Sequence, residues 1–433
     1  MKGDQKNISR RRFLGTTLAG TAGLLILPGF KAMKPSDTIR LGFIGLGRQA
    51  MFLLNSFLNI EGVSVVAGCD VYGIKRSRFE QRVRSFYESK GKSPEVFMCE
   101  RYEDLLARPD VDAVVIATPD HWHALIAIDA CRAGKDVYLE KPLTFTILEG
   151  KRLVKAVREN NRILAVGSQQ RSDPNFQYAV RLVQEGKLGA IKEVIVHVGD
   201  HPKPYDLPEE PLPADLNWDL WLGPNPWVHY NHELNPPISL NPPKDEELWG
   251  AWRWYKETGG GLMTDWGAHM FDIAQWGLGM DQSGPVEIIP AGFQDVRVLT
   301  YHYSNGIVMT QQTFDKTGTQ GVKFIGSEGW IEVARGYFRA SNRKLKPKVS
   351  KEKGPYETKI SHQQNFIDAI RSRKDPVVPV EIGHRTCTVC NLGNIAHELQ
   401  RPVRWDPSTE MFVNDQEAEK FMHRQYREGY KLV

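Results

Sequence analysis

The pattern of apolar and polar positions divides the chain into two parts. In the first part, short apolar runs of strand length lie at residues 38–44, 63–69, 111–117, 136–139 and 163–167. Between several of these runs, apolar residues recur at helical spacing. Strands that alternate with helices indicate βαβ units, so residues 38–165 are predicted to form a Rossmann domain with a doubly wound parallel sheet.

The second part, residues 166–405, begins with a helical pattern and continues mainly with short strand-like runs. These runs occupy residues 192–198, 286–291, 296–303, 306–314, 322–326 and 329–333. Successive strands with few helices between them favour a C-terminal α+β domain with a largely antiparallel open sheet. Helices are predicted at residues 175–185, 361–372, 383–400 and 414–430. The last of them would make residues 406–433 a helical tail.

The composition is that of a globular protein, because 41% of the 433 residues are hydrophobic and 25% are charged. This excludes an intrinsically disordered chain and a polytopic membrane protein. From Lys34 onward 50 basic side chains stand against 51 acidic ones, and this near-neutral body argues against a nucleic-acid partner. Five scattered cysteines and the isolated histidines lack metal-ligand spacing, so no metal is expected. Cys387 and Cys390 form a C-x-x-C, but they lie in a predicted helix and are interpreted as buried thiols.

Residues 1–33 have the features of a twin-arginine export signal. Arg10, Arg11 and Arg12 precede a mildly apolar run at residues 14–30. A retained membrane anchor is the alternative, but this run is interrupted by glycines and a proline and is short for a stable span of about 20 residues. We therefore expect export to a periplasmic or other extracytoplasmic space, with no membrane span in the mature chain.

A glycine-rich turn joins the first predicted strand to the next helix. Gly45, Gly47 and Ala50 form G-x-G-x-x-A, with Arg48 and Gln49 between them. Gly45 permits a tight turn, Gly47 lets the backbone approach a pyrophosphate, and Ala50 allows close helix packing. The N–H groups at the start of the helix would face the anion. The sequence therefore predicts a dinucleotide site.

Asp70 ends the second predicted strand. A carboxylate at this position accepts a hydrogen bond from the adenosine ribose and repels a 2′-phosphate, so NAD is the expected cofactor. Lys75 and Arg76 keep NADP as an alternative, because a nearby cation can accommodate that phosphate.

Two further loops follow predicted strands at the same edge of the sheet, where ligands of open α/β sheets bind. The first contains Thr118, Pro119 and His123, and the second is Glu140-Lys141-Pro142. Together with the glycine turn, this Glu-Lys-Pro resembles the Gfo/Idh/MocA family of sugar and cyclitol oxidoreductases over about residues 38–405. The resemblance implies NAD-dependent hydride transfer, with these loops beside the cofactor and Lys141 as the catalytic lysine near the nicotinamide.

Residues 259–272 carry Asp265 and His269 four positions apart, after three glycines. On one helix the two side chains would share a face, so the carboxylate could orient the imidazole. A histidine can accept the proton of a secondary alcohol as hydride leaves the carbon. The resemblance implies that this pair acts with Lys141. The alternatives are a solvated lysine and an incidental histidine on a packed helix.

Four other residues are candidate substrate contacts: Gln170, Arg171, Trp266 and Asp272. Gln170 and Arg171 follow a predicted strand, and Trp266 and Asp272 lie on either side of His269 in the sequence. A structural role for Asp272 is equally compatible with its position one turn beyond His269.

Residues 200–249 form a long loop rich in proline, and tryptophans cluster from Trp218 to Trp276. Long loops in compact domains are usually functional. Indole faces could bind a sugar, but core filling or an oligomer interface explains the same residues.

The sequence thus predicts an exported oxidoreductase that moves a hydride at a secondary alcohol carbon of a sugar or cyclitol and holds its cofactor tightly. The alternative is an NAD-dependent glycosidase that oxidises its sugar transiently at C3. Exported glycosidases of this kind are expected to carry Tyr-Pro-Thr-His where this chain has residues 264–269, which favours the dehydrogenase. A non-catalytic, NAD-bound sugar sensor is the third hypothesis. Pairing of subunits into a homo-oligomer is also expected.

Overall fold

The computed structural model describes residues 38–93, 95–241, 249–347 and 361–432. The predicted export signal lies outside these residues. No helix in the described part of the chain combines the length and the apolar character that crossing a membrane requires.

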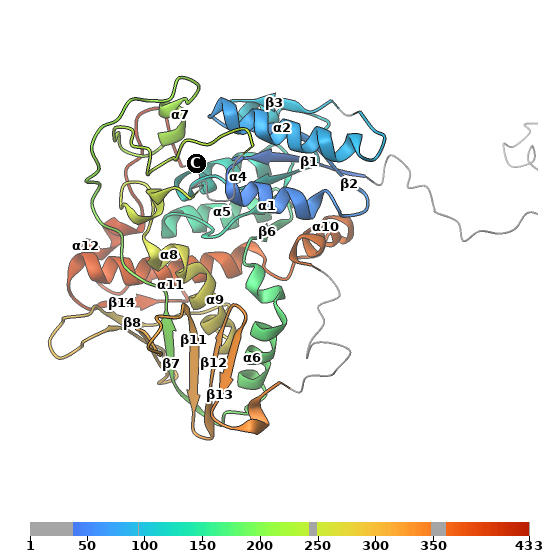
Figure 1. The fold of residues 1–433 in the computed structure, drawn as a ribbon. Helices are drawn as coiled ribbons and strands as arrows, with labels where there is room; N and C mark the ends of the chain where they lie inside the picture. Colours follow the sequence, from blue (N-terminus) through green and yellow to red (C-terminus); the bar gives the residue numbers. More distant parts are fainter. Residues whose placement is uncertain (1–37, 94, 242–248, 348–360, 433) are drawn as a thin grey trace, which may run out of the picture. The chain divides into compact units, whose positions relative to one another are not determined.

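The first domain is built on a six-stranded parallel sheet in the order β3-β2-β1-β4-β5-β6 (Figure 1). Its strands are β1 (Ile39–Ile44), β2 (Val63–Cys69), β3 (Phe97–Cys99), β4 (Ala113–Ile116), β5 (Asp136–Leu139) and β6 (Leu164–Val166). Its helices are α1 (Arg48–Phe57), α2 (Gly73–Glu88), α3 (Tyr102–Leu106), α4 (Asp120–Arg132) and α5 (Ile147–Glu159). This strand order defines the doubly wound dinucleotide-binding fold, and the predicted fold class is confirmed.

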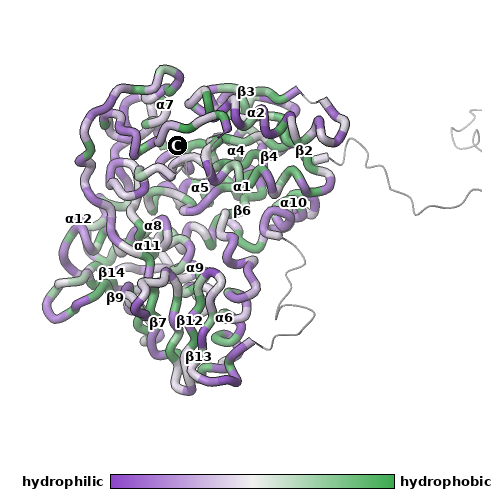
Figure 2. Tube along the Cα trace, viewed as in Figure 1, coloured by the Kyte–Doolittle hydropathy of each residue, from purple (hydrophilic) through white to green (hydrophobic). Residues whose placement is uncertain are grey.

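Both faces of the parallel sheet are covered, because alternate residues of one strand enter different cores. In β4, Val114 and Ile116 pack with α4 and α5, whereas Ala113 and Val115 pack with α1 and α2. Figure 2 shows hydrophobic residues concentrated in the strands of both sheets. Continuous apolar runs of this kind distinguish a strand that is buried on two sides.

The second domain contains a nine-stranded sheet in the order β13-β12-β11-β7-β10-β9-β8-β14-β15. All its pairings are antiparallel except that of β10 with β7. The strands are β7 (Ile191–His197), β8 (Glu287–Ile289), β9 (Leu299–His302), β10 (Val308–Gln311), β11 (Gly321–Gly326), β12 (Gly329–Ala334), β13 (Tyr337–Ala340), β14 (Val403–Asp406) and β15 (Met411–Phe412). Helices α6 (Pro174–Gln184) and α9 (Gly267–Gly277) pack on it.

Two helices late in the chain tie the second domain to the first. Helix α10 (His362–Ser372) packs Phe366 into the core beside α1. Helix α11 (Val380–Leu399) buries Cys387 in the first domain and Cys390 in the second. All five cysteines are free, and these two fill core positions one turn apart, as predicted.

The predicted helix over residues 414–430 is wrong. The structure has only α12 (Gln416–Glu419) and the 3₁₀ turn η5 (Lys420–Met422), and residues 423–432 form an arm without helix. Tyr426, Tyr430 and Leu432 pack on the core of the first domain. The helical spacing of the tyrosines is therefore satisfied by docking of an irregular segment, which Gly429 helps to turn with φ of +91°.

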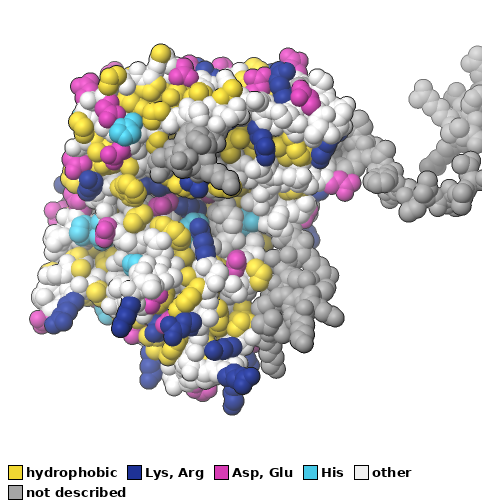
Figure 3. Space-filling view, in the orientation of Figure 1, with side chains coloured by type: hydrophobic (Ala, Val, Ile, Leu, Met, Phe, Trp, Pro, Cys, Tyr) yellow, Lys and Arg dark blue, Asp and Glu magenta, His cyan; other side chains and the backbone are white. Residues whose placement is uncertain are grey.

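The proline-rich segment also packs against the first domain. It contains α7 (Trp218–Leu222) and the 3₁₀ turn η3 (Ala251–Trp254), and its apolar side chains form a separate small core with Tyr72. The rings of Trp218 and Trp221 stack at 4.5 Å inside this core. Figure 3 shows hydrophobic side chains gathered where Figure 1 places α7 and its flanking loop. Several of these tryptophans therefore fill a core, although Trp227 is 62% exposed.

Candidate active site

The glycine turn between β1 and α1 has the geometry that a dinucleotide requires. Gly45 has φ of +80°, and a Cβ there would lie 2.7 Å from the backbone nitrogen of Thr118. A Cβ on Gly47 would meet no atom of the described residues within 4 Å, so this part of the structure leaves the backbone open to a ligand. Among the described residues no side chain caps the N-terminus of α1. Its N–H groups are therefore free to bind a pyrophosphate.

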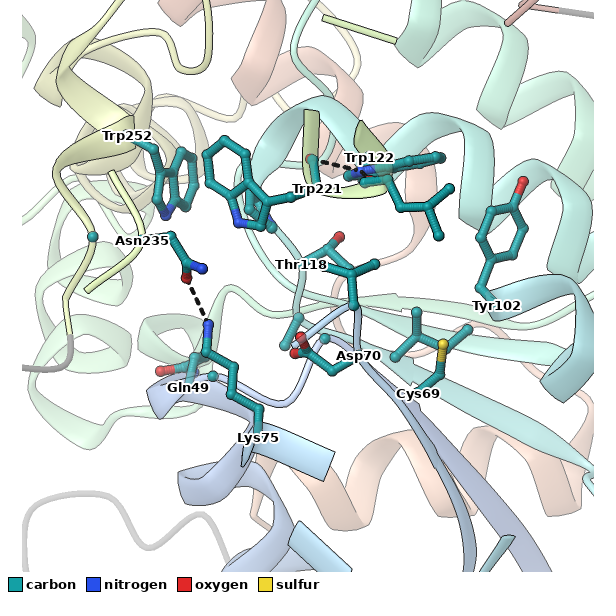
Figure 4. A pocket seen from close by; sticks show the side chains of 18 of the residues that line it. Gln49, Cys69, Asp70, Lys75, Tyr102, Thr118, Trp122, Trp221, Asn235 and Trp252 are labelled. Atoms are coloured by element: carbon teal, nitrogen blue, oxygen red, sulfur yellow. Dashed lines mark hydrogen bonds between the residues drawn. The ribbon is translucent and has the colours of Figure 1, made fainter. Parts of the chain in front are cut away.

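Asp70 is fixed by two backbone donors. Its Oδ2 accepts a hydrogen bond from the N–H of Leu46 at 2.7 Å, and its Oδ1 accepts one from Tyr72 at 2.9 Å. The predicted cation Lys75 donates to Oδ1 of Asn235 at 2.8 Å, as Figure 4 shows. Burial lowers the pKa of Lys75. The carboxylate is positioned for a ribose, while the lysine is engaged by the long loop.

These residues line a narrow groove of about 150 Å³. Its inner wall is the sheet edge, with the glycine turn, Asp70, Thr118 and Pro119. Its outer wall comes from distant parts of the chain: Trp221, Asn235 and Trp252 (Figure 4). Tyr430 also lines the groove. The long loop and the C-terminal arm therefore enclose the dinucleotide site from outside. No motif in the sequence predicts this contribution from Tyr430.

His123 lies behind the groove. Its Nδ1 is 2.7 Å from the carbonyl of Pro142, and its Nε2 is 3.0 Å from the carbonyl of Thr118. The ring joins the two loops that carry Thr118 and Lys141, and it lines neither cavity of the site. The sequence predicts His123 beside the cofactor. In the structure His123 instead lies where it supports the two loops.

Glu140 links the glycine turn to the substrate side. Its Oε1 accepts hydrogen bonds from the amides of Gln49 and Gln169, at 2.7 and 2.8 Å, and its Oε2 accepts one from the N–H of Lys141. Burial raises the pKa of this carboxyl group. Its hydrogen-bonding capacity is used in holding α1, the end of β5 and the 3₁₀ turn η2 (Gln169–Ser172) together.

Lys141 and Asp265 form an ion pair across the two domains. Lys141 Nζ donates to the Asp265 carboxylate and, at 3.0 Å, to its backbone carbonyl. Arg253 adds a second cation, with its Nε 3.6 Å from Asp265 Oδ1. Burial opposes ionisation of Asp265, but the charges of Lys141 and Arg253 outweigh burial and hold its pKa well below the usual range.

His269 has a different partner from the one predicted. Asp265 ends the short helix α8 (Leu262–Asp265), whereas His269 lies near the start of α9, and no hydrogen bond joins the two side chains in the described structure. Instead, the guanidinium of Arg335 donates to His269 Nε2 at 2.8 Å, and Nδ1 is buried with no partner among the described residues. Burial and the nearby charges of Lys141 and Arg335 lower the pKa of His269 well below 6.5. Arg335 sits in the turn after β12, and no motif in the sequence marks it.

A second cavity of about 990 Å³ adjoins the groove. The side chains on its wall include Asp120, Lys141, Gln170, Asp265, Trp266, His269 and Arg335. Gln49, Thr118, Trp249, Trp252 and Arg253 line both spaces. A group bound in the groove can therefore meet a molecule bound in the cavity.

Of the four predicted substrate contacts, Gln170 and Trp266 line this cavity. Arg171 and Asp272 do not, because they form a buried bidentate ion pair with both bonds at 2.8 Å. Asp281 binds the same guanidinium from the other side. These charges satisfy one another inside the second domain, so the pair acts structurally rather than as a substrate contact.

No group of three or more histidine, cysteine or acidic residues in the described ranges could hold a metal ion.

Comparison with protein families matches both domains. Residues 39–168 match the model of the oxidoreductase family's NAD-binding Rossmann fold, and residues 195–432 match that of the same family's C-terminal alpha/beta domain. The chain belongs to the Gfo/Idh/MocA oxidoreductase family. Its first domain is accordingly an NAD-binding domain, as predicted.

Curated relatives carry glycosidase names. The chain is 28% identical over 207 residues to a glycosyl hydrolase family 109 protein of Shewanella putrefaciens and to an alpha-N-acetylgalactosaminidase of Shewanella oneidensis. Each match covers 43% of this chain and 44% of the relative, so the chain spans less than half the length of these relatives.

Similar solved structures include dehydrogenases. The WlbA dehydrogenase from Bordetella pertussis, in complex with NADH and UDP-GlcNAcA, has a TM-score of 0.58 at 19% identity and covers 85% of this chain and 99% of its own. Scyllo-inositol dehydrogenase from Lactobacillus casei, with NAD(H) and scyllo-inositol, has a TM-score of 0.54 at 17% identity, with the same coverage. At these identities the likeness concerns the fold.

Proposed function

We propose that this protein is an NAD-dependent oxidoreductase that moves a hydride at a secondary alcohol carbon of a sugar or cyclitol. The observation that carries the proposal is the position of the Lys141–Asp265 ion pair in a large cavity that shares a wall with the dinucleotide groove. Gln170, Trp266 and Arg335 add polar and aromatic groups that suit a hydroxylated ring.

The groove residues would hold the cofactor through the glycine turn, the start of α1 and Asp70. When bound, the nicotinamide of NAD supplies a hydride acceptor. Lys141 uses two of its N–H groups on Asp265, and its third has no acceptor among the described residues. That N–H can donate to a substrate oxygen and stabilise negative charge on it. Asp265 keeps the lysine in place, and Arg253 binds the same carboxylate.

The role of His269 as general base depends on Arg335. Because Arg335 donates to Nε2, a neutral ring carries its hydrogen on Nδ1 and has no free lone pair for a proton. His269 can accept the alcohol proton only when an occupant of the cavity displaces this guanidinium from Nε2.

The enclosed groove supports a tightly held cofactor. Arg427 in the C-terminal arm donates to the Asp219 carboxylate at 2.7 Å and to the Gly223 carbonyl at 3.0 Å, which fastens the arm to the long loop. Trp122 packs edge-on against Tyr430 beside the groove. A cofactor behind this wall would be reoxidised in place, which suits a compartment without a pool of free NAD.

The names of the curated relatives favour one second candidate, an NAD-dependent glycosidase in which the hydride returns to the sugar within each turnover. The chemistry at Lys141 would be the same, and bond cleavage would follow the oxidation. Residues 264–269 read Thr-Asp-Trp-Gly-Ala-His, with Asp265 supporting the lysine, and this places the dehydrogenase first.

One experiment separates these functions. The purified protein is assayed for bound NAD by its absorbance, and then mixed with free sugars, scyllo-inositol and nitrophenyl glycosides while absorbance at about 340 nm and aglycone release are followed together. A lasting rise at 340 nm without cleavage supports the dehydrogenase, and cleavage without a lasting rise supports the glycosidase. Bound NAD that responds to no compound would leave the sensor as the function.

We also propose export by the twin-arginine route, on the basis of residues 1–33. Because this route carries folded proteins, it would allow the cofactor to be loaded first. Replacing Arg11 and Arg12 with lysine should retain the protein in the cytoplasm, as measured by cell fractionation. Unchanged export of this variant would refute the route.

A further inference from the structure

Arg335 is a cation on the wall of the large cavity, in the turn between β12 and β13. The residue is exposed, so a ligand in the cavity can reach its guanidinium. No carboxylate in the described part of the chain forms an ion pair with it. Asp265, Glu140 and Asp173 act on it only through longer-range attraction.

Neutral groups hold the guanidinium in place. Its Nη2 donates to Nε2 of His269 at 2.8 Å, and its plane lies over the Trp266 ring, 4.7 Å from the centroid. In the orientation that satisfies both ends of the Gln170 amide, the oxygen accepts from Arg335 Nε at 3.0 Å. The remaining nitrogen, Nη1, has no acceptor among the described residues. The guanidinium therefore keeps donors for an occupant of the cavity.

The nearest carboxylates are engaged elsewhere. Asp265 is bound by Lys141 and Arg253. Glu140 accepts from two glutamine amides and a backbone N–H, and Asp173 caps the start of α6. Since each of them already has donors, the positive charge of the guanidinium is left without a direct counter-ion.

The charge on the cavity wall also favours an anion. Lys141, Arg253 and Arg335 all line the cavity. Burial raises the pKa of Asp120 to about 7 and also raises the pKa of Glu140. Both shifts weaken the negative charge that opposes the three cations, so a ligand with a negative group gains more from this wall than a neutral one.

We propose that Arg335 is a specificity-determining residue that binds a carboxylate of the substrate, and that the preferred substrates are sugar acids of the hexuronic type. The inference rests on the proposed function and deepens it. A guanidinium can bind the two oxygens of a carboxylate through two parallel N–H donors. Such charge-assisted hydrogen bonds are stronger than a bond to a neutral imidazole, so the exchange of His269 for the carboxylate is favourable.

This exchange also prepares the general base. Once Nη2 has turned to the carboxylate, the lone pair on Nε2 of His269 is free to accept the hydroxyl proton. In the step, the C–H bond breaks and its electron pair passes as hydride to the bound cofactor. The O–H bond breaks with its pair retained to form C=O, and the proton goes to Nε2. The charges of Lys141 and Arg335 disfavour a protonated His269, and the bound carboxylate counteracts them. A neutral sugar has no anion with which to draw the guanidinium away.

Binding gives the first test, by calorimetry on the full-length protein with two matched pairs, glucose with glucuronate and galactose with galacturonate. The wild type should bind the acid about tenfold or more tightly than its neutral partner. The difference should shrink as the salt concentration rises, because the ion pair is partly exposed. Glucose 6-phosphate tests the other common anion, and tighter binding of it than of glucuronate would overturn the choice of a carboxylate.

Three variants assign this preference. Arg335→Met keeps the length of the side chain but removes its donors, and it should bind acid and neutral sugar equally. Arg335→Lys keeps the charge and should retain part of the difference. Arg339→Met is the control on β13, because Arg339 is 63% exposed and does not line the cavity. A preference for the acid that survives in Arg335→Met, or that is missing in the wild type, overturns the inference.

Reduction of bound NAD gives the second test. The wild type should oxidise the acid of a pair about tenfold or more efficiently, and Arg335→Met should lose this advantage while it oxidises the neutral sugar no more slowly. His269→Asn should lose about 100-fold or more with every sugar and still bind the acid more tightly.

The outcomes of the second test separate the two proposals. A wild type that oxidises glucose and galactose as efficiently as their acids overturns this inference alone. A wild type whose bound NAD responds to no sugar overturns the proposed function, and the inference with it. Melting temperatures and NAD content establish that each variant is folded.

Discussion

The two spaces of this site are built for different tasks. The dinucleotide groove is narrow and has a loop and an arm on its outer side, whereas the adjoining cavity is wider, with a volume of about 990 Å³. The inner wall of the groove includes the glycine turn, and the wall of the cavity includes charged side chains from both domains. The comparison indicates a site that retains one ligand and exchanges the other.

The largest effect is expected from Lys141→Ala, which removes the donor in the cavity. Reduction of bound NAD should fall by about 10³-fold, because charge on the substrate oxygen loses its stabilisation. NAD content should stay unchanged, since the groove keeps its walls. Stopped-flow absorbance measures the rate, and Lys155→Ala, at an exposed position on α5, serves as control. Loss of NAD together with activity would show that the two spaces do not work separately.

Gly45→Ala, in contrast to Lys141→Ala, should reduce the amount of NAD bound in the groove. A Cβ at this position would press on the backbone of Thr118 in a conformation with φ of +80°. Gly134→Ala is a matched control, because Gly134 has φ of +77° and no atom within 4 Å of the added Cβ. NAD content should fall by about tenfold or more in Gly45→Ala only, which corresponds to about 1.4 kcal/mol in binding. Equal losses in both variants would mean that backbone strain alone is responsible.

Arg427→Ala should loosen the outer wall. The variant loses the bonds to Asp219 and Gly223, so bound NAD should dissociate about tenfold faster, for about 1.4 kcal/mol lost. Exchange against labelled NAD measures this rate. The exposed Arg404 provides a control substitution to alanine. An unchanged exchange rate would show that the arm does not retain the cofactor.

The smallest effect is expected on the pH dependence of the free energy of unfolding, through two histidines near the groove. Burial lowers the pKa of His121 to about 3 and that of His123 to about 4. The unfolded chain therefore binds more protons below about pH 6.5, and these residues make the free energy of unfolding decrease as pH falls. His121→Gln should remove roughly 1 kcal/mol per pH unit of this decrease between pH 6 and pH 4. The raised pKa of Asp120 makes the free energy of unfolding change with pH in the opposite direction. Asp120 is present in both the wild type and the variant, so its contribution cancels in the comparison. Identical pH dependence in urea unfolding would refute the assignment.

The sequence predicted the parts of the molecule that depend on neighbouring residues. The parallel sheet follows from apolar runs between helical segments, and the turn at Gly45 follows from its glycines and from Asp70. It also predicted that Lys141 and Asp265 belong to one site, and the structure joins their side chains in an ion pair.

The sequence did not predict contacts that form between distant segments. Arg335 reaches His269 from a turn of the second sheet, and Arg253 reaches Asp265 from the long loop. The charges and the aromatic spacing of residues 414–430 suit a helix, so the sequence predicts one there. Packing on the first domain decides its conformation instead.

The outer wall of the groove has a consequence for biosynthesis. The glycine turn emerges early from the ribosome, whereas Tyr430 is added almost 400 residues later. The nucleotide can therefore bind to the glycine turn while translation continues, and the C-terminal arm then closes the groove over it. Protein stripped of its nucleotide should reload slowly under native conditions and quickly after mild, reversible denaturation.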